Sequence, residues 1–108
     1  MPISYYVKEN LNFIYTTFRG RVDRSDILKH LDKIKHDSRI RDGYREICDY
    51  RGADTIAVTS DDFFSIVVVE ESITTLKSSK LAAVTDKTSQ FGIGRMYQMI
   101  AEKNRPNV

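Results

Sequence analysis

Two side chains able to bind an anion stand at the end of a short apolar segment near the middle of the chain. Residues 44–49 contain Ile47 and Cys48 and favour a strand, and Asp49 and Arg51 open the polar stretch that follows. Helical patterns lie before and after this segment, an order typical of a parallel sheet. Ligands of such sheets bind at the carboxyl ends of the strands. We therefore expect Asp49 and Arg51 to lie at the ligand-binding end of a sheet.

Three further positions extend this candidate into an anion pocket. Helices are expected to start near Ser60 and near Ser89, and Arg95 lies one turn into the second of them. Free backbone donors and the positive end of a helix both favour a phosphate or a carboxylate. The structural alternative is that Arg51 forms an ion pair with a neighbouring aspartate.

The sequence does not contain the residue spacings typical of a metal site or of nucleophilic catalysis. His30 and His36 have no partner at a spacing typical of a metal site. Cys48 lies in an apolar strand without a histidine nearby, which favours a packed thiol over a nucleophile. No Ser-His-Asp arrangement or nucleophile elbow occurs. We expect no enzyme activity, no metal site and no cofactor.

Length and composition indicate one soluble domain that spans residues 1–108. The chain has 108 residues, of which 41% are apolar or aromatic, enough for a single core. Its 17 basic and 15 acidic residues give a net charge of +2, too balanced to predict a nucleic-acid or membrane surface. One cysteine excludes an internal disulfide, and no segment approaches the ~20 apolar residues of a membrane span. We expect a cytoplasmic protein.

The first third of the chain predicts a hairpin followed by a helix. Residues 3–7 and 11–19 favour two strands joined by a polar turn, and alternation in the second strand places apolar side chains on both faces. Gly20 is expected to close that strand. Asp23 is placed to cap a helix that runs to about His36, with an apolar stripe at helical spacing.

The rest of the chain predicts two further pairs of strand and helix. After a turn at residues 37–43, the strand at 44–49 should lie parallel to the strand before it, through a right-handed crossover. A helix from 61 to about 77, a strand at 81–84 and a helix from about 90 to 104 follow. The order of elements is β-β-α-β-α-β-α, and it calls for one more strand after the last helix.

Apolar residues that point away from the predicted core form a candidate interface. For residues 61–77 we choose a helix over a strand, because a cap and acidic first turn precede a helical stripe at Ile66, Val69, Ile73 and Leu76. A second apolar cluster then faces away from this stripe. On the last helix, Arg95 lies at four-residue steps from two outward apolar residues, Phe91 and Met99. The interface candidates are Phe63, Phe64, Val67, Phe91 and Met99.

Several of these segments together resemble a known family. They are Gly20 followed by the Asp23-capped helix, the turn at 37–43, Asp49-Tyr50-Arg51-Gly52 after the strand, and Phe91-Gly92-Ile93-Gly94-Arg95-Met96 at the start of the last helix. The chain resembles the small bacterial STAS-like proteins grouped with the sporulation anti-sigma-factor antagonist (SpoIIAA-like). The resemblance implies an α/β fold with a mixed sheet, an antiparallel first strand and packed helices. It also implies that relatives continue into a last strand and a short helix.

The residues after the central strand depart from the phosphorylated members of this family. Where those antagonists have a serine or threonine that a kinase modifies, this chain has Tyr50 and Arg51. The nearest hydroxyl groups belong to Thr55, Thr59 and Ser60. The resemblance therefore does not support a phosphorylation switch here.

Two functions remain open at this point. The first is a non-enzymatic binding or regulatory domain that contacts another protein or a second copy of itself through the interface candidates. The alternative is a carrier or sensor of a small anionic or amphipathic molecule, held by Arg51 and Arg95 beside the phenylalanines.

Overall fold

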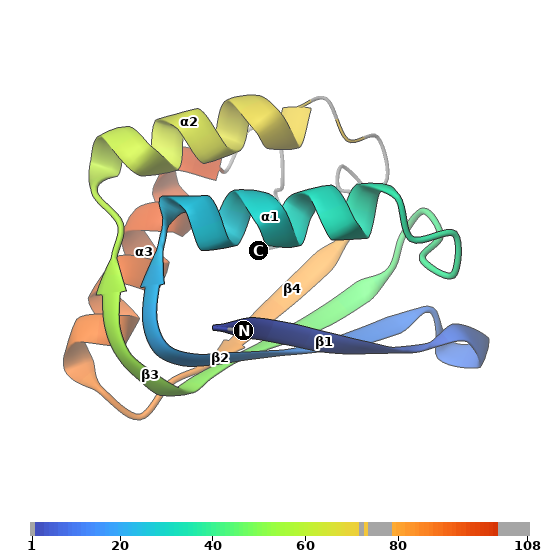
Figure 1. Ribbon diagram of the computed structural model, residues 1–108, viewed down its shortest axis with the longest axis horizontal. Helices are drawn as coiled ribbons and strands as arrows, with labels where there is room; N and C mark the ends of the chain where they lie inside the picture. Colours follow the sequence, from blue (N-terminus) through green and yellow to red (C-terminus); the bar gives the residue numbers. More distant parts are fainter. Residues whose placement is uncertain (1, 72, 74–78, 102–108) are drawn as a thin grey trace.

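The computed structural model describes residues 2–71, 73 and 79–101, and within them the predicted α/β order is confirmed. One sheet contains four strands in the order β1 (Ile3–Lys8), β2 (Phe13–Asp23), β3 (Arg45–Ala57) and β4 (Lys80–Val84). Three helices, α1 (Arg24–Lys35), α2 (Ser60–Glu71) and α3 (Thr88–Ala101), pack against this sheet (Figure 1). A short 3-10 helix, η1 (Glu9–Leu11), joins β1 to β2.

The sheet is mixed, as the resemblance implies. β1 pairs antiparallel with β2, whereas β2 with β3 and β3 with β4 are parallel. Asn12 closes the hairpin in the left-handed region, with φ of 47°, and its side-chain amide donates to the carbonyl oxygens of Arg41 and Asp42. The hairpin turn is therefore tied to the loop that leads into β3.

β2 and β3 both run further than the sequence pattern predicts. Gly20 does not end β2, which continues to Asp23, and β3 continues to Ala57 instead of ending at Asp49. The two extensions pair with each other, from Arg19 opposite Gly52 to Asp23 opposite Ala57. This mutual pairing supplies the backbone hydrogen bonds that keep both segments extended. Asp49 and Arg51 consequently lie inside a strand, and the prediction of a loop there is wrong.

Two glycines permit the irregular pairing between these extensions. The register shifts between Thr17 and Arg19 and again between Gly20 and Arg21, as in a β-bulge. Gly20 has φ of 64°, a conformation that other residues rarely adopt. At Gly52 the strands approach so closely that a Cβ atom would lie 3.0 Å from the Phe18 carbonyl oxygen. Both strands curve at this point (Figure 1).

Capping residues start α1 and α2 where the sequence predicts. The Asp26 N–H donates to Asp23 Oδ1 at 3.1 Å and the Asp23 N–H donates to Asp26 Oδ2 at 3.0 Å, a reciprocal capping box. Thr59 and Asp62 form the same arrangement at the start of α2. The choice of a helix for this segment is confirmed for residues 60–71. Further along the predicted helix, Ile73 is not helical, and residues 72 and 74–77 lie outside the described part of the chain.

α2 turns a partly different face to the core than its apolar pattern predicts, although Ile66 of the predicted stripe is buried. Phe63 and Val67 are 5% and 7% exposed, so the prediction that they point outward is wrong. Val69, predicted to be in the core, is 38% exposed. The buried stripe passes through Glu70, whose carboxylate finds a hydrogen-bond donor inside the protein, and this polar position concealed the stripe in the sequence. Phe64 remains outside, at 58% exposure.

All three helices pack on one face of the sheet. Successive residues of β2 alternate between buried and half-buried, and the buried set, Ile14, Thr16 and Phe18, faces the helices. The core joins this face to α1, α2 and α3, and α1 and α2 lie above the sheet in Figure 1. The other face of β2, with Phe13 and Tyr15, is only half-buried. No described helix covers that face.

The close approach at Gly52 makes a prediction about stability. Gly52→Ala should lower the free energy of unfolding by about 1–3 kcal/mol, because the added methyl group meets backbone that cannot move without breaking the β2–β3 pairing. Gly92→Ala is the matched control: its Cβ would meet no atom within 4 Å, and alanine favours a helix, so stability should rise by roughly 0.5–1 kcal/mol. Urea denaturation measures both. Equal effects at the two positions would contradict the account of Gly52.

Candidate functional site

A cavity of about 260 Å³ lies between the helix-facing side of the sheet and the three helices. Its walls are mainly apolar and come from all the layers around it. They include Phe18 of β2, Ile27 of α1, Ile66 of α2, Leu81 of β4 and Ile93 of α3. The exposed residues Ala83 and Phe91 also line it, which places its opening beside β4 and the start of α3.

Buried polar groups of α1 and β3 form one wall of the cavity. The Thr16 hydroxyl donates to Glu46 Oε2 at 2.6 Å, and His30 Nε2 lies 3.3 Å from the same oxygen. Glu46 and His30 are 4% and 8% exposed. The His30 ring also meets the rings of Tyr5 and Phe18 edge to face. A buried carboxylate is costly unless it is hydrogen-bonded, so this cluster fixes Glu46 in place.

A second buried carboxylate lies on the helix side of the cavity. Glu70 of α2 is 3% exposed, and the Tyr97 hydroxyl of α3 lies 2.8 and 2.7 Å from its two carboxylate oxygens. Phe63 and Tyr97 are also in ring contact, with centroids 5.5 Å apart. These contacts join α2 to α3 over the cavity.

The inner polar groups of the cavity are therefore acidic or neutral. Glu46 and Glu70 are carboxylates, and Tyr50 is a phenol whose pKa is raised well above its usual value because it is buried and lies near Cys48 and Glu46. The described lining also contains two basic residues: His30, whose ring lies against Glu46, and Arg95, whose exposed guanidinium donates to Gln98 Oε1 at 3.0 Å. The interior thus favours neutral or cationic groups over anions.

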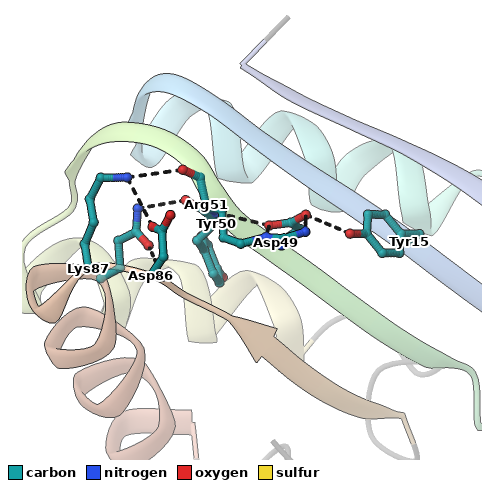
Figure 2. A network of polar contacts seen from close by, with 7 residues as sticks. Tyr15, Asp49, Tyr50, Arg51, Asp86 and Lys87 are labelled. Atoms are coloured by element: carbon teal, nitrogen blue, oxygen red, sulfur yellow. Dashed lines mark hydrogen bonds and ion pairs between the residues drawn. The ribbon is translucent and has the colours of Figure 1, made fainter.

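Side chains at the start of α3 attach this helix to β3. The Gln90 amide nitrogen donates to the carbonyl oxygens of Tyr50 at 2.7 Å and Ala53 at 2.9 Å. Lys87 Nζ donates to the Arg51 carbonyl oxygen at 3.1 Å and also contacts Asp86. Figure 2 shows these contacts along one side of β3. They hold α3 in place as the outer wall of the cavity.

Asp49 and Arg51 do not line the cavity but pair with each other on the opposite face of the sheet. Two hydrogen bonds of 3.0 and 2.9 Å join the Arg51 guanidinium to the Asp49 carboxylate, and the Tyr15 hydroxyl donates to the same carboxylate at 2.7 Å (Figure 2). These donors hold the pKa of Asp49 far below its usual value, and the carboxylate raises the pKa of Arg51. Arg51 therefore forms an ion pair with Asp49, which was the alternative to an anion-binding role.

The predicted anion pocket is consequently not assembled. Asp49 and Arg51 lie on one face of the sheet, whereas Arg95 borders the cavity on the other. Ser60 is exposed at the start of α2 and does not line the cavity. Ser89 lies in the first turn of α3, after the start at Thr88. The alternation of side chains along β3 is the reason, because it turns Asp49 away from the helices while its neighbour Cys48 faces them.

Three of the five interface candidates are exposed and two are buried. Phe64, Phe91 and Met99 are 58%, 62% and 72% exposed, so these three point outward as expected. Phe63 and Val67 belong to the buried side of α2. Binding of a partner by the outward three remains a prediction.

Sequence reasoning missed the polar groups that line the cavity, although a signal for some of them was present. His30 adjoins the apolar stripe of α1, and Glu46 shares its alternation with the buried residues Tyr44 and Cys48. A charged residue at an inward position of a strand indicates a buried partner or a functional site. Cys48 itself is buried, as expected of a packed thiol.

The described residues contain neither a cluster of metal-binding side chains nor a membrane-spanning helix. No group of three or more His, Cys, Asp or Glu side chains in residues 2–71, 73 and 79–101 is placed to hold a metal ion. Within the same ranges, no helix has both the length and the apolar character that crossing a membrane requires.

Comparison with known proteins supports the architecture. No family model matches the chain, and no curated protein matches it. Among solved structures, it is similar to an uncharacterised protein of the DUF3478 family with a SpoIIAA-like fold from Shewanella loihica PV-4. The TM-score is 0.56, over 90% of this chain and 78% of the other. The chain has a SpoIIAA-like fold. At 12% sequence identity the likeness concerns the fold alone.

Within the SpoIIAA-like fold, the network around Asp49 makes a prediction about pH. Because the pKa of Asp49 in the folded protein is far below 3.8, its ionised form stabilises the fold fully above about pH 4. That contribution is lost as the pH falls through the folded pKa. Asp49→Asn should therefore be less stable than the wild type near neutral pH, and the difference should shrink below about pH 3.8.

Urea denaturation across this pH range measures the difference. Asp54→Asn, at an exposed position of the same strand, controls for the loss of one negative charge. A difference for Asp49→Asn that stays constant down to about pH 2 would contradict the assignment.

Proposed function

We propose that this protein is a non-enzymatic, cytoplasmic STAS-like binding domain that holds a small, mostly apolar molecule in the cavity between the sheet and the helices. The single observation that carries the proposal is the cavity itself, about 260 Å³ in size, with apolar walls and a few fixed polar groups. Pockets for small molecules have this composition: apolar surface provides affinity and a few polar groups provide orientation.

The chemistry of the walls supports a neutral or cationic ligand. Glu46 and Glu70 would accept hydrogen bonds from a hydroxyl or an amine, whereas an anion would lose its hydration in the mainly apolar cavity. The guanidinium of Arg51 is on the other face of the sheet and neutralised by Asp49. The anionic head group considered from the sequence is therefore the less favoured class.

A non-enzymatic role fits the way in which the polar groups of the cavity are used. His30 and Thr16 contact Glu46, and the Tyr97 hydroxyl contacts Glu70. Each side chain thus has a structural partner within the protein. These contacts fix the carboxyl groups in place, as is required of groups that orient a ligand.

A fluorescent probe with and without a negative charge tests the proposal. N-phenyl-1-naphthylamine is neutral, and 1-anilinonaphthalene-8-sulfonate adds a sulfonate to the same skeleton. The neutral probe should become fluorescent on binding, and its affinity should exceed that of the sulfonate at least about tenfold, because burying a charge next to a carboxylate is unfavourable. Fluorescence titration measures both affinities.

Two neighbouring residues of β4 supply the matched variants. Ala83→Phe fills the cavity from its opening and should abolish binding of the neutral probe, whereas Ala82→Phe adds the same group on the opposite face and should leave binding unchanged. Absence of binding by the wild type, or equal loss in the two variants, would overturn the proposal.

A contact with another protein is the second candidate function. Phe64 on α2, and Phe91 and Met99 on α3, expose large apolar side chains to solvent. Exposed apolar groups of this size are favourable to bury in an interface. Phe64 and Met99 do not line the cavity, whereas Phe91 borders its opening, so a domain with both functions would couple ligand and partner.

Native mass spectrometry tests the contact. If the protein associates with itself, Phe64→Asp should shift the spectrum from dimer to monomer, because a buried carboxylate opposes the interface. Asp61→Asn, an exposed change on the same helix, should have the same number of subunits as the wild type. An unchanged mass for Phe64→Asp in a dimeric protein would exclude this surface.

A further inference from the structure

The sheet face that no described helix covers carries aromatic and basic side chains in two adjoining rows. Residues paired across strands point to the same side of a sheet, so the register defines the rows. One row contains Lys8, Phe13, Arg45 and Lys80, and the next contains Tyr6, Tyr15, Ile47 and Ala82. Every strand of the sheet therefore contributes to this surface, which we call the open face.

Two tyrosines form an aromatic platform on the β1 and β2 side of the open face. The rings of Tyr6 and Tyr15 are stacked, with centroids 5.7 Å apart and planes 14° from parallel. Tyr6 is 53% exposed, so its ring offers surface to a ligand. The hydroxyl of Tyr15 is held by Asp49, which Arg51 fixes in turn. The platform is thus fixed before any ligand arrives, which lowers the entropic cost of binding.

Three positive charges of the open face have no acidic partner among the described residues, whereas Arg51 is paired with Asp49. Lys8, Arg45 and Lys80 are exposed and lie in one row, and none of them forms an ion pair with a described acidic residue. The third row of the open face contains Ser4, Thr17, Asp49 and Val84. Asp49 is the carboxylate in these three rows, and Arg51 neutralises it. The open face is therefore positive although the whole chain is nearly neutral.

We propose that the open face binds single-stranded nucleic acid. Unpaired bases stack on aromatic side chains of exposed sheets while basic groups contact the phosphates, and this face supplies both elements side by side. The rows are two residues apart along each strand, roughly 7 Å, so a base on the tyrosines has its flanking phosphates near the basic row. Duplex DNA would not use the platform, because its bases are already stacked.

Other anionic partners fit the open face less well. An acidic peptide would use the basic row but leave the tyrosine platform without a role. An anionic membrane surface would attract the same cations but would leave the stacked tyrosine rings without a stacking partner. Only stacking combined with charge uses both rows.

The segregation of charge explains why composition did not predict this surface. A net charge of +2 indicates no nucleic-acid binding when the charges are averaged over the chain. Parallel and antiparallel pairing brings together cations that are far apart in the sequence, at positions 8, 45 and 80. The averaged charge therefore conceals the local one.

Fluorescence anisotropy with a labelled oligouridine of about 12 nucleotides tests the proposal. The double variant Arg45→Glu with Lys80→Glu should weaken binding at least about tenfold, because it reverses the charge of the basic row. The control double variant, Lys29→Glu with Lys33→Glu, makes the same change in net charge at exposed positions of α1 and should remain within about threefold of the wild type. Circular dichroism confirms folding of each variant.

A second variant separates stacking from charge alone. Tyr6→Leu keeps an apolar side chain but removes the exposed ring, and it should weaken binding of the oligouridine roughly 5- to 100-fold while leaving binding of inorganic polyphosphate unchanged. Lack of binding by the wild type, or equal losses in the two double variants, would overturn the proposal. So would an unchanged affinity of Tyr6→Leu, or a preference for phosphatidylglycerol vesicles over the oligonucleotide.

Discussion

The parallel pairing of β2 with β3 is the interaction on which the rest of the molecule depends. It continues from Phe13 opposite Arg45 to Asp23 opposite Ala57, well beyond the end of β4 at Val84. Because side chains alternate along both strands, this one pairing assigns each residue to the cavity or to the open face. Buried Glu46 and Cys48 face the helices, while the Asp49 and Arg51 pair lies on the other side. A slip by one residue would exchange the two surfaces.

Local patterns were sufficient to predict the elements and their order. The caps at Asp23 and Thr59 depend on residues close in sequence, and so does the helical spacing in α1. These features can therefore be predicted from a single sequence. The length of β3 was not readable in this way, because residues 50–57 are extended only through pairing with the extension of β2. Polar residues caused the other errors: buried Glu70 concealed the inward face of α2, and Asp49 resembled the start of a loop.

The candidate site was less predictable than the fold because it depends on contacts between distant segments. His30 and Glu46 approach each other across sixteen positions of sequence, and Glu70 meets Tyr97 across twenty-seven. No single-sequence pattern specifies such pairs. The same holds for the row of Lys8, Arg45 and Lys80, which only the register of four strands assembles. What sequence did provide was the residue types, from which we expected binding and not catalysis.

The contacts of Gln90 and Lys87 have a consequence for solubility. Beyond Asp49, β3 has β2 on one side and no further described strand on the other, so its backbone groups on that side form an exposed edge. Such an edge can pair with a strand of another molecule and begin aggregation. Gln90 occupies the carbonyl oxygens of Tyr50 and Ala53, and Lys87 occupies that of Arg51. Two polar side chains at the start of α3 thus block the stretch of the sheet that would otherwise recruit a neighbouring chain.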